Sequence, residues 1–268
     1  MSNETEIKNL GAFLYEQHET QDDDVKFILQ TIGAPAKKVL EVACGGGRIL
    51  VPLAKAGHDA WGFDMDDDML ANIPAKALGL SNIHWCNADA LLDDWGAGFD
   101  VVVLAGNLLF NIEIGAGIEY KKAQELFIQK AANALVTGGY LYIGYNPWAP
   151  NGRTLTRPAG YNVEDDGNVV WEWEGTDEHG NYQREWTTSG AFDEDSGILT
   201  STNGCEQRLA DGTHAEEITF GIKHYATLEH IHGWLTAAGF EIEQQYENFD
   251  KKPIDDDSTT LIIYARKK

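Results

Sequence analysis

KVLEVACGGGR, residues 38–48, is the stretch of sequence that decides the fold of this chain. It begins as an apolar strand and breaks into three glycines, which let the backbone turn sharply and approach a ligand without a Cβ in the way. A helical stretch at 49–56 follows, and then a short second strand at 60–63 that ends on Asp64. This order of strand, glycine loop, helix, strand and acidic residue is typical of a nucleotide-binding βαβ unit, in which the acid accepts hydrogen bonds from a ribose diol.

The form of the glycine loop narrows the choice of nucleotide. The dinucleotide fingerprint G-x-G-x-x-G requires a third glycine where this chain has Leu50, which disfavours NAD and FAD. Glu41-x-Ala43-x-Gly45-x-Gly47 instead resembles motif I of the class I S-adenosylmethionine-dependent methyltransferases. In that family the loop curls around the methionine moiety of the cofactor. Taken alone, the motif could instead be a glycine turn in an unrelated α/β protein.

Composition limits the size and the partners of the protein. A chain of 268 residues can bury a full core in one domain with an elaboration, but it is short for two independent domains. The 43 acidic and 20 basic residues give a net charge of −23. Such a surface repels phosphate backbones and anionic lipids, so we expect no nucleic-acid or membrane partner. The acidity indicates either ordinary solubility or adaptation to a salty cytoplasm.

Cysteine usage and the N-terminal sequence indicate the compartment. The 3 cysteines show no C-x-x-C spacing and no pairable framework. Residues 1–6 lack the basic region and apolar core of a signal peptide, and no apolar stretch approaches membrane-spanning length. We therefore expect a reduced, cytoplasmic, soluble protein that is a monomer or a homodimer.

Strands and helices alternate regularly over the first half of the chain. Strands are predicted at 38–42, 59–63, 83–86, 99–104 and 139–145. The clearest helix spans 119–135 and is expected to stop at Gly138-Gly139. Short runs rich in valine and leucine, without polar alternation, belong in a sheet that is buried on both faces. Regular βα alternation predicts a Rossmann-like, doubly wound, mostly parallel sheet.

The pattern changes after residue 150. Alternating strands such as 169–174, 182–186 and 198–201 are separated by turn signals, which predicts a small antiparallel sheet. A helix at 227–238 and strands at 240–246 and 259–265 then complete a main sheet of seven strands. The predicted fold class is α/β. Residues 1–150 and 222–268 are expected to form the cofactor-binding domain, with 151–221 as an inserted antiparallel sheet that forms an acceptor lid.

Further motifs fall where this family makes its cofactor contacts. The resemblance implies that Asp64 accepts from both ribose hydroxyls and that Met65 lies against the adenine. It also implies that Asp89 accepts from the adenine amino group while the next backbone N–H meets the ring. Gly106-Asn107 resembles the Gly-Asn of glycine and sarcosine N-methyltransferases. The implied S-adenosylmethionine site consists of Ala43, Gly45, Gly47, Asp64, Met65, Asp89, Ala90, Ala105 and Asn107.

Two of these residues also have a purely structural interpretation. Asp64 could be a helix N-cap, although Asp66 or Asp67 would suit that role better. Asp89 could be a turn residue.

The inserted sheet resembles that of glycine and sugar-amine N-methyltransferases, where it roofs the acceptor pocket. An Arg-Asn-Tyr follows the fifth strand in the glycine enzymes. This chain instead has Gly-Tyr-Asn-Pro-Trp at residues 144–148, so the arginine is missing there. Arg153 and Arg157 could substitute for it. The resemblance implies a small-molecule acceptor and favours an amine. The alternatives are an O-methyltransferase acting on a carboxylate or hydroxyl, and a methyltransferase-like regulatory module.

The acceptor side is predicted from aromatic and polar residues. Trp171 and Trp173 share one face of a strand and form either an aromatic wall for an amine or part of a core. His230 and His232, two apart on a helix, point in different directions, so we expect no metal site. No catalytic residue is assigned. The candidates for acid–base roles are Tyr145, His214 and His224, and those for substrate contacts are Tyr15, Asn146, Trp148 and Trp171.

Overall fold

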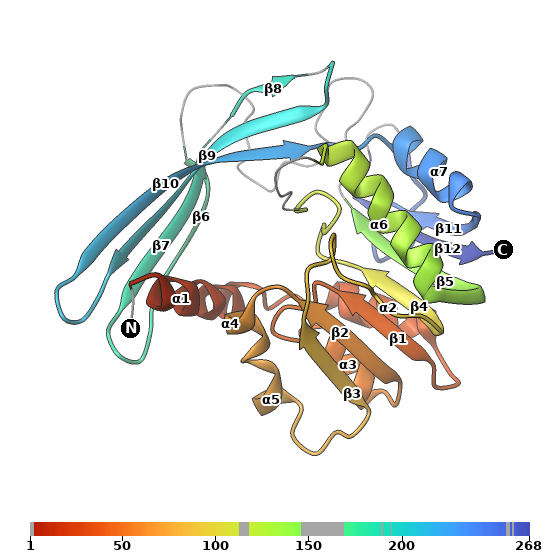
Figure 1. The fold of residues 1–268 in the computed structure, drawn as a ribbon, viewed down its shortest axis with the longest axis horizontal. Coiled ribbons are helices and arrows are strands. Elements are labelled where there is room, and N and C mark those ends of the chain that lie inside the picture. Colours follow the sequence, from red (N-terminus) through yellow and green to blue (C-terminus); the bar gives the residue numbers. More distant parts are fainter. Residues whose placement is uncertain are drawn as a thin grey trace. The chain divides into compact units, whose positions relative to one another are not determined.

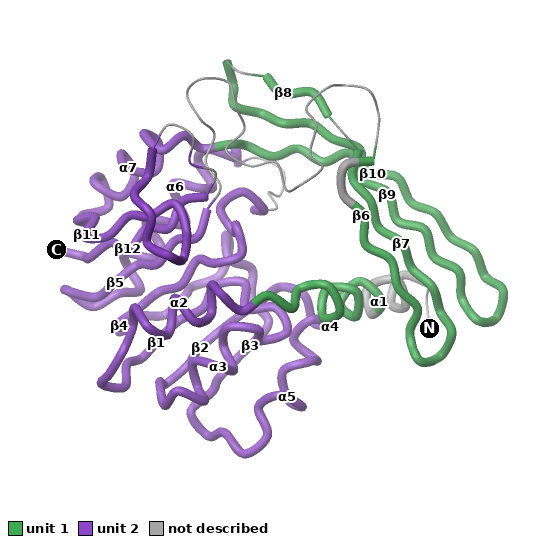
Figure 2. The backbone as a smooth tube through the Cα atoms, turned by 180° about the vertical axis from the view of Figure 1, so that it is seen from behind, with its two compact units in different colours: residues 1–21, 156–225 green, residues 22–155, 226–268 purple. Residues whose placement is uncertain are grey.

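The chain folds into two compact units (Figure 2). The computed structural model describes residues 3–112, 118–145, 169–188, 190–193, 195–255, 258 and 260–268. One unit contains residues 1–21 and 156–225, and the other contains 22–155 and 226–268. The sequence had predicted residues 1–150 as part of the main domain, whereas residues 1–21 group with the antiparallel sheet.

The larger unit contains the predicted mostly parallel, seven-stranded sheet (Figure 1). Its strand order is β11-β12-β5-β4-β1-β2-β3. β1 pairs in parallel with β2 and β4, whereas β12 is antiparallel to β5 and β11. The predicted fold class is confirmed. The strands are β1 (Lys38–Val42), β2 (Asp59–Asp64), β3 (Ile83–Asn87), β4 (Phe99–Leu104), β5 (Leu135–Tyr145), β11 (Phe240–Tyr246) and β12 (Leu261–Lys267).

Both faces of this sheet are buried, because successive strand residues point to opposite sides. Val39 and its neighbours on one face pack with residues of α2 and α3. Leu40 and its neighbours on the other face pack with residues of α6 and α7. None of the helices in the described ranges is long and apolar enough to cross a membrane. The helices of this unit are α2 (Asp23–Ile32), α3 (Leu50–Lys55), α4 (Asp67–Leu70), α5 (Ile73–Lys76), α6 (Tyr120–Ala134) and α7 (Leu228–Ala237).

The junction between α6 and β5 differs from the prediction. Helix α6 ends at Ala134, and Leu135 is already extended, with φ −79° and ψ 147°. Gly138 and Gly139 therefore lie inside β5, and their predicted role as the helix stop was wrong. The pairing of β4 with β5 shifts register in this region, and Gly138, with φ +79°, adopts the left-handed conformation that favours glycine.

The smaller unit combines an N-terminal helix with an antiparallel sheet. The order of the main path is β10-β9-β7-β6, and β8 pairs with β9. Helix α1, which the sequence did not predict, packs against β6 and β7. Its His18 ring stacks on Trp173 at 5.2 Å, which explains why residues 1–21 group with this sheet. The elements are α1 (Asn3–His18), β6 (Val169–Thr176), β7 (Tyr182–Thr188), β8 (Phe192–Asp193), β9 (Ile198–Arg208) and β10 (His214–His224).

Two glycine-to-alanine changes should have opposite effects on stability. One is at the close packing of β2 against the glycine loop, and the other is inside α7. A Cβ at Gly62 would lie 2.9 Å from the Cys44 side chain and 2.9 Å from Leu50 Cδ2. We expect Gly62→Ala to lower the free energy of unfolding by about 1–3 kcal/mol through overpacking. Gly233, inside α7, has nothing within 4 Å of such a Cβ, so Gly233→Ala should raise it by roughly 0.5–1 kcal/mol. Urea unfolding of both variants tests the pair, and equal stabilities would contradict it.

Candidate functional site

The candidate cofactor site lies where the order of strands in the main sheet reverses. From β1 the chain continues to β2 and β3 on one side, whereas β4 and β5 lie on the other side. In open α/β sheets, ligands bind beyond the carboxyl ends of the strands at such a switch point. The loops that follow β1 and β4 leave the sheet there, and they carry predicted cofactor residues.

The backbone of both loops adopts the left-handed conformation. After β1, φ is 56° at Ala43, 50° at Gly45 and 79° at Gly47. After β4, φ is 61° at Gly106 and 58° at Asn107. Positive φ is uncommon for residues other than glycine, and such conformations cluster at ligand-binding sites. Ala43 and Asn107 thus carry strain on the two sides of the switch point.

Asp64, at the end of β2, connects directly to the glycine loop. Its Oδ2 accepts a hydrogen bond from the Gly45 backbone N–H at 2.8 Å, and its Oδ1 accepts from Asp66 N at 3.0 Å. Each carboxylate oxygen can accept a further bond, so the group is suited to the two hydroxyls of a diol. Asp66 is the N-cap of α4, so the N-cap interpretation of Asp64 does not hold.

Met65 is presented by the turn that follows Asp64. Its side chain is 56% exposed, which is unusual for an apolar residue beside a buried strand end. Asn87, at the end of β3, holds this turn by donating from Nδ2 to Met65 O at 3.0 Å and to Asp67 Oδ1 at 2.7 Å. An exposed thioether on a fixed turn is suited to lie against an aromatic ring.

Asp89 lies in the loop after β3, where it stabilises a tight turn. Its Oδ1 accepts from the backbone N–H groups of Leu91 at 2.7 Å and Leu92 at 3.1 Å. The turn interpretation of Asp89 thus has direct support, and its contact with adenine stays a prediction. The carbonyl of Ala90 accepts from Trp95 Nε1 and Lys130 Nζ, both at 2.9 Å, which fixes the loop against α6.

A buried acid beneath the glycine loop was not predicted as a site residue. Glu41 in β1 is 4% exposed, and its Oε2 has no hydrogen-bond partner in the structure. Burial raises the pKa of Glu41 well above its usual range, and the nearby Arg48 opposes the shift. Arg48 is held by Asp24 of α2 through two hydrogen bonds of 2.7 Å. The signal in the sequence was an acid inside an otherwise apolar strand.

These features fit S-adenosylmethionine. The Asp64 carboxylate can accept further bonds from ribose hydroxyls, and the exposed apolar surface of Met65 can lie against an adenine ring. The unpartnered Glu41 Oε2 costs free energy beneath the loop. Lys76 of α5 also fixes the loop by donating to Gly46 O at 2.8 Å.

The predicted acceptor residues are divided between the two units. The Tyr145 hydroxyl is buried in the larger unit and accepts from Ala226 N at 2.7 Å, so it connects β5 to the segment before α7. Tyr15 lies on α1 in the smaller unit, with its ring 6.0 Å from that of Trp173. The backbone of Trp171 lies in β6 of that unit, whereas Asn146 and Trp148 fall outside the described residues. The contact between the Tyr15 and Trp173 rings shows that Trp173 packs against α1.

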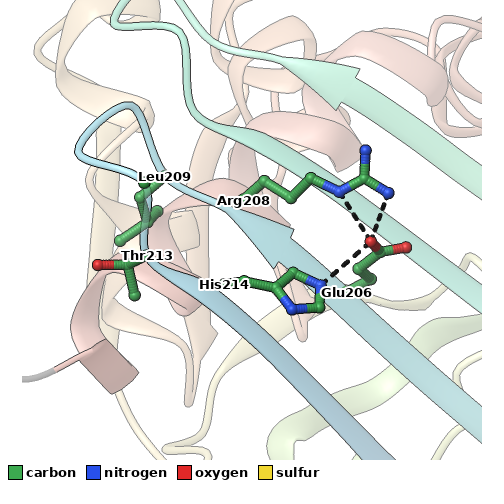
Figure 3. Close-up of a pocket in the computed structure, with 6 residues that line it drawn as sticks. Glu206, Arg208, Leu209, Thr213 and His214 are labelled. Carbon is green, nitrogen blue, oxygen red and sulfur yellow. Dashed lines mark hydrogen bonds and ion pairs between the residues drawn. The ribbon is translucent and has the colours of Figure 1, made fainter.

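The two candidate histidines lie at opposite ends of β10. His224 is buried at 4% exposure next to Gly197. His214 is exposed at the hairpin between β9 and β10, where its Nε2 lies 3.2 Å from Glu206 Oε1 (Figure 3). Arg208 donates to the same oxygen, and it lowers the pKa of Glu206. His214 is therefore part of an exposed ion-pair cluster at the end of a hairpin, beside a shallow surface pocket.

The predicted absence of a metal site stays a prediction. Among the described residues, no group of three or more His, Cys, Asp or Glu side chains has the geometry of a metal site. His230 completes a capping box with Thr227 at the start of α7, and His232 Nε2 lies 2.6 Å from Gln245 Oε1.

Part of the sequence is similar to a known protein family. Residues 39–139 match the family model described as a methyltransferase domain. The matched range thus carries a methyltransferase domain. This domain includes β1 to β4 and ends within β5.

Curated relatives are similar over a limited length. The ubiquinone biosynthesis O-methyltransferase of Methylococcus capsulatus is 37% identical over 81 residues, which are 29% of this chain and 34% of that protein. The enzyme of the same name from Chelativorans sp. is 28% identical over 108 residues, or 40% of this chain and 39% of that protein. The chain thus matches about a third to two-fifths of the length of these relatives.

Solved structures share the fold over nearly the whole chain. An S-adenosylmethionine-dependent methyltransferase from Clostridium acetobutylicum matches with a TM-score of 0.70 at 14% identity, covering 97% of this chain and 98% of that one. A sugar N-methyltransferase from Streptoalloteichus sp. matches with a TM-score of 0.66 at 20% identity, covering 96% and 92%. At this coverage the shared fold includes the antiparallel sheet.

Replacing Asp64 tests the predicted ribose contact. Asp64→Ala removes the acceptor for both hydroxyls, so affinity for S-adenosylmethionine should fall by about 1–3 kcal/mol, as for hydrogen bonds to a charged group. Asp59→Ala, at the opposite end of β2, is the matched control and should leave affinity nearly unchanged. Isothermal titration calorimetry measures both. Unchanged affinity in Asp64→Ala would refute the assignment.

The buried Glu41 predicts a pH-dependent stability. Burial raises the pKa of Glu41 in the folded chain above the ordinary value of 4.5. At a pH between these two pKa values, Glu41 is ionised in the unfolded chain but stays protonated in the folded chain. Its contribution to stability is therefore full below pH 4.5 and is lost as the pH rises. Glu41→Gln cannot ionise, so its melting temperature relative to wild type should increase as the pH rises to neutrality. A difference that is constant with pH would contradict this.

Proposed function

We propose that this protein transfers the methyl group of S-adenosylmethionine to an amine nitrogen of a small molecule. The observation that carries the proposal is the switch-point site, where the Asp64 carboxylate is hydrogen-bonded to the glycine loop and has oxygens that can each accept a further bond. The strained backbone at Ala43 and Asn107 on the two neighbouring loops supports a bound ligand at the same place.

S-adenosylmethionine supplies a methyl group on a sulfonium, which is a good leaving group when a nucleophile attacks in line. The protein therefore has to hold the donor, orient the acceptor behind the methyl group and remove water from between them. Asp64, Met65 and the glycine loop would hold the ribose, the adenine and the methionine moiety. Lys76 and Asn87 keep the loop and the turn in place through their contacts with Gly46 and Met65.

Two described side chains, at the end of β5 and in α7, favour an amine over an oxygen acceptor. An alcohol usually needs a general base, whereas an amine needs only to arrive deprotonated, because its lone pair is already available. The Tyr145 hydroxyl is buried and already accepts from Ala226 N. His230 Nδ1 accepts from Thr227 N at 3.3 Å, so that nitrogen is engaged in capping α7. Neither group is arranged as a dedicated base.

The relatives support two acceptor chemistries. Neighbours in structure include a sugar N-methyltransferase and an amino pentose methyltransferase, and their likeness extends over 94–96% of this chain. The curated relatives are named as O-methyltransferases, but their similarity extends over 29–44% of the chain. The wider likeness favours the amine. An oxygen acceptor is therefore the second candidate.

We infer that the antiparallel sheet provides the acceptor side. In this proposal residues 151–221 form the lid, and contacts come from Tyr15, Asn146, Trp148 and Trp171. The aromatic residues would favour a cationic or amine acceptor through their ring faces. The ring contacts of Trp173 with Tyr15 and His18 give that tryptophan a packing role within the smaller unit, so the proposal depends on Trp171.

A radiolabelled methyl-transfer assay across a small-molecule library tests the acceptor. The library should contain amino sugars, amino acids, simple amines, phenols and carboxylic acids. We expect labelled product from an amine, with kcat/KM rising with pH up to the pKa of that amine, because only the neutral form is nucleophilic. Asp64→Ala is the negative control.

Two outcomes distinguish the alternatives. Transfer only to phenols or acids, or activity that is abolished by a chelator and restored by magnesium, would replace the amine proposal with an oxygen acceptor. Binding of S-adenosylmethionine without transfer to any compound would favour a regulatory module.

A further inference from the structure

One edge strand of the smaller unit exposes a row of large apolar side chains. Ile218, Phe220 and Ile222 of β10 are 50%, 84% and 45% exposed. Because they alternate along the strand, they lie on one face of the sheet. A soluble protein seldom leaves large apolar side chains clustered in water unless they meet a partner.

Among the described residues, the backbone edge of β10 also has no further strand beside it. β10 pairs with β9 over the whole range from His214 to His224, without a shift in register. It is the last strand in the sheet order, and no other strand within the described ranges pairs with it (Figure 1). Proteins normally protect a long edge with proline, a bulge or a covering segment. Residues 214–224 contain no proline, and their pairing with β9 contains no bulge.

The exposed row lies on the face that α1 does not cover. Glu217 is opposite Cys205 in the ladder, and Cys205 is opposite Glu185. Glu185 in turn approaches Gly11 of α1, so these side chains share the helix-covered face. Ile218 and Phe220 alternate with Glu217 and belong to the opposite face.

The sequence of this edge is complementary to itself. Residues 217–223 are Glu-Ile-Thr-Phe-Gly-Ile-Lys, with Phe220 at the centre. On the two sides of this centre, the acid Glu217 corresponds to the base Lys223, Ile218 corresponds to Ile222, and the small Thr219 corresponds to Gly221. In an antiparallel pair with a two-fold axis at Phe220, Ile218 lies opposite Ile222 and Glu217 opposite Lys223. Both pairs occur twice, because the axis repeats every contact.

We propose that β10 is a homodimer interface, where two copies of this chain join their sheets edge to edge in antiparallel register about Phe220. Apolar pairs lie on one face of the joined sheet and acid–base pairs on the other, and each type stabilises cross-strand contact. In a chain with 43 acidic and 20 basic residues, a randomly chosen partner of an acid is more often another acid than a base. This register brings each Glu217 to a base, which identifies a second copy as the partner.

Sedimentation velocity of the full-length protein tests the interface. We expect wild type to be a dimer at micromolar concentration. Phe220→Glu brings two carboxylates together at the axis and should weaken association roughly tenfold or more. Leu78→Glu is the matched control, because Leu78 is 83% exposed in the larger unit, and that variant should stay dimeric. Circular dichroism verifies that both variants are folded.

A charge exchange tests the register itself. Glu217→Lys and Lys223→Glu each create like-charge pairs and should be mostly monomeric when alone. An equimolar mixture of the two variants restores an acid opposite a base at both positions, so it should form heterodimers. The same should hold for the double variant Glu217→Lys/Lys223→Glu as a homodimer. Monomeric wild type, dimeric Phe220→Glu, or a mixture of folded variants that fails to associate would overturn the proposal.

Discussion

The hydrogen bond from the Gly45 amide to the Asp64 carboxylate is the constraint on which the candidate site depends. It connects the loop after β1 to the end of β2 at 2.8 Å and fixes the direction of the carboxylate. The contact is possible because Gly62 lets β2 approach Cys44 and Leu50 without a Cβ between them. A larger residue at position 62 would separate the loop from the strand and move the acid away from the switch point.

The doubly covered sheet gives this contact its rigidity. Side chains of β1 and β4 are buried alternately against α2 and α3 on one face and against α6 and α7 on the other. Polar groups inside such a layer must be satisfied, and most are. Glu41 is one exception, with a raised pKa and an unpartnered Oε2. The larger unit thus carries a cost in stability next to the loop that a ligand would contact, as is common at functional sites.

The smaller unit follows a different principle. Its antiparallel sheet is covered on one face by α1, through contacts such as that of Trp173 with His18. The opposite face carries ion pairs between strands, including Arg184 with Glu172, together with the apolar row of β10. One covered and one open face is usual for antiparallel sheets, and among the described residues no helix packs on this second face.

The sequence by itself determined the βα alternation, the seven-stranded sheet, the glycine loop and the acid at the end of β2. These features depend on short-range patterns, such as apolar runs, glycine spacing and alternation, so they can be recognised along the chain. Only the tertiary structure decided contacts between distant residues. The Tyr145 hydroxyl meets Ala226, α1 packs on Trp173, and Glu41 Oε2 is left without a hydrogen-bond partner. These depend on which surfaces meet after folding, and no local pattern encodes the partner of a side chain that lies many residues away.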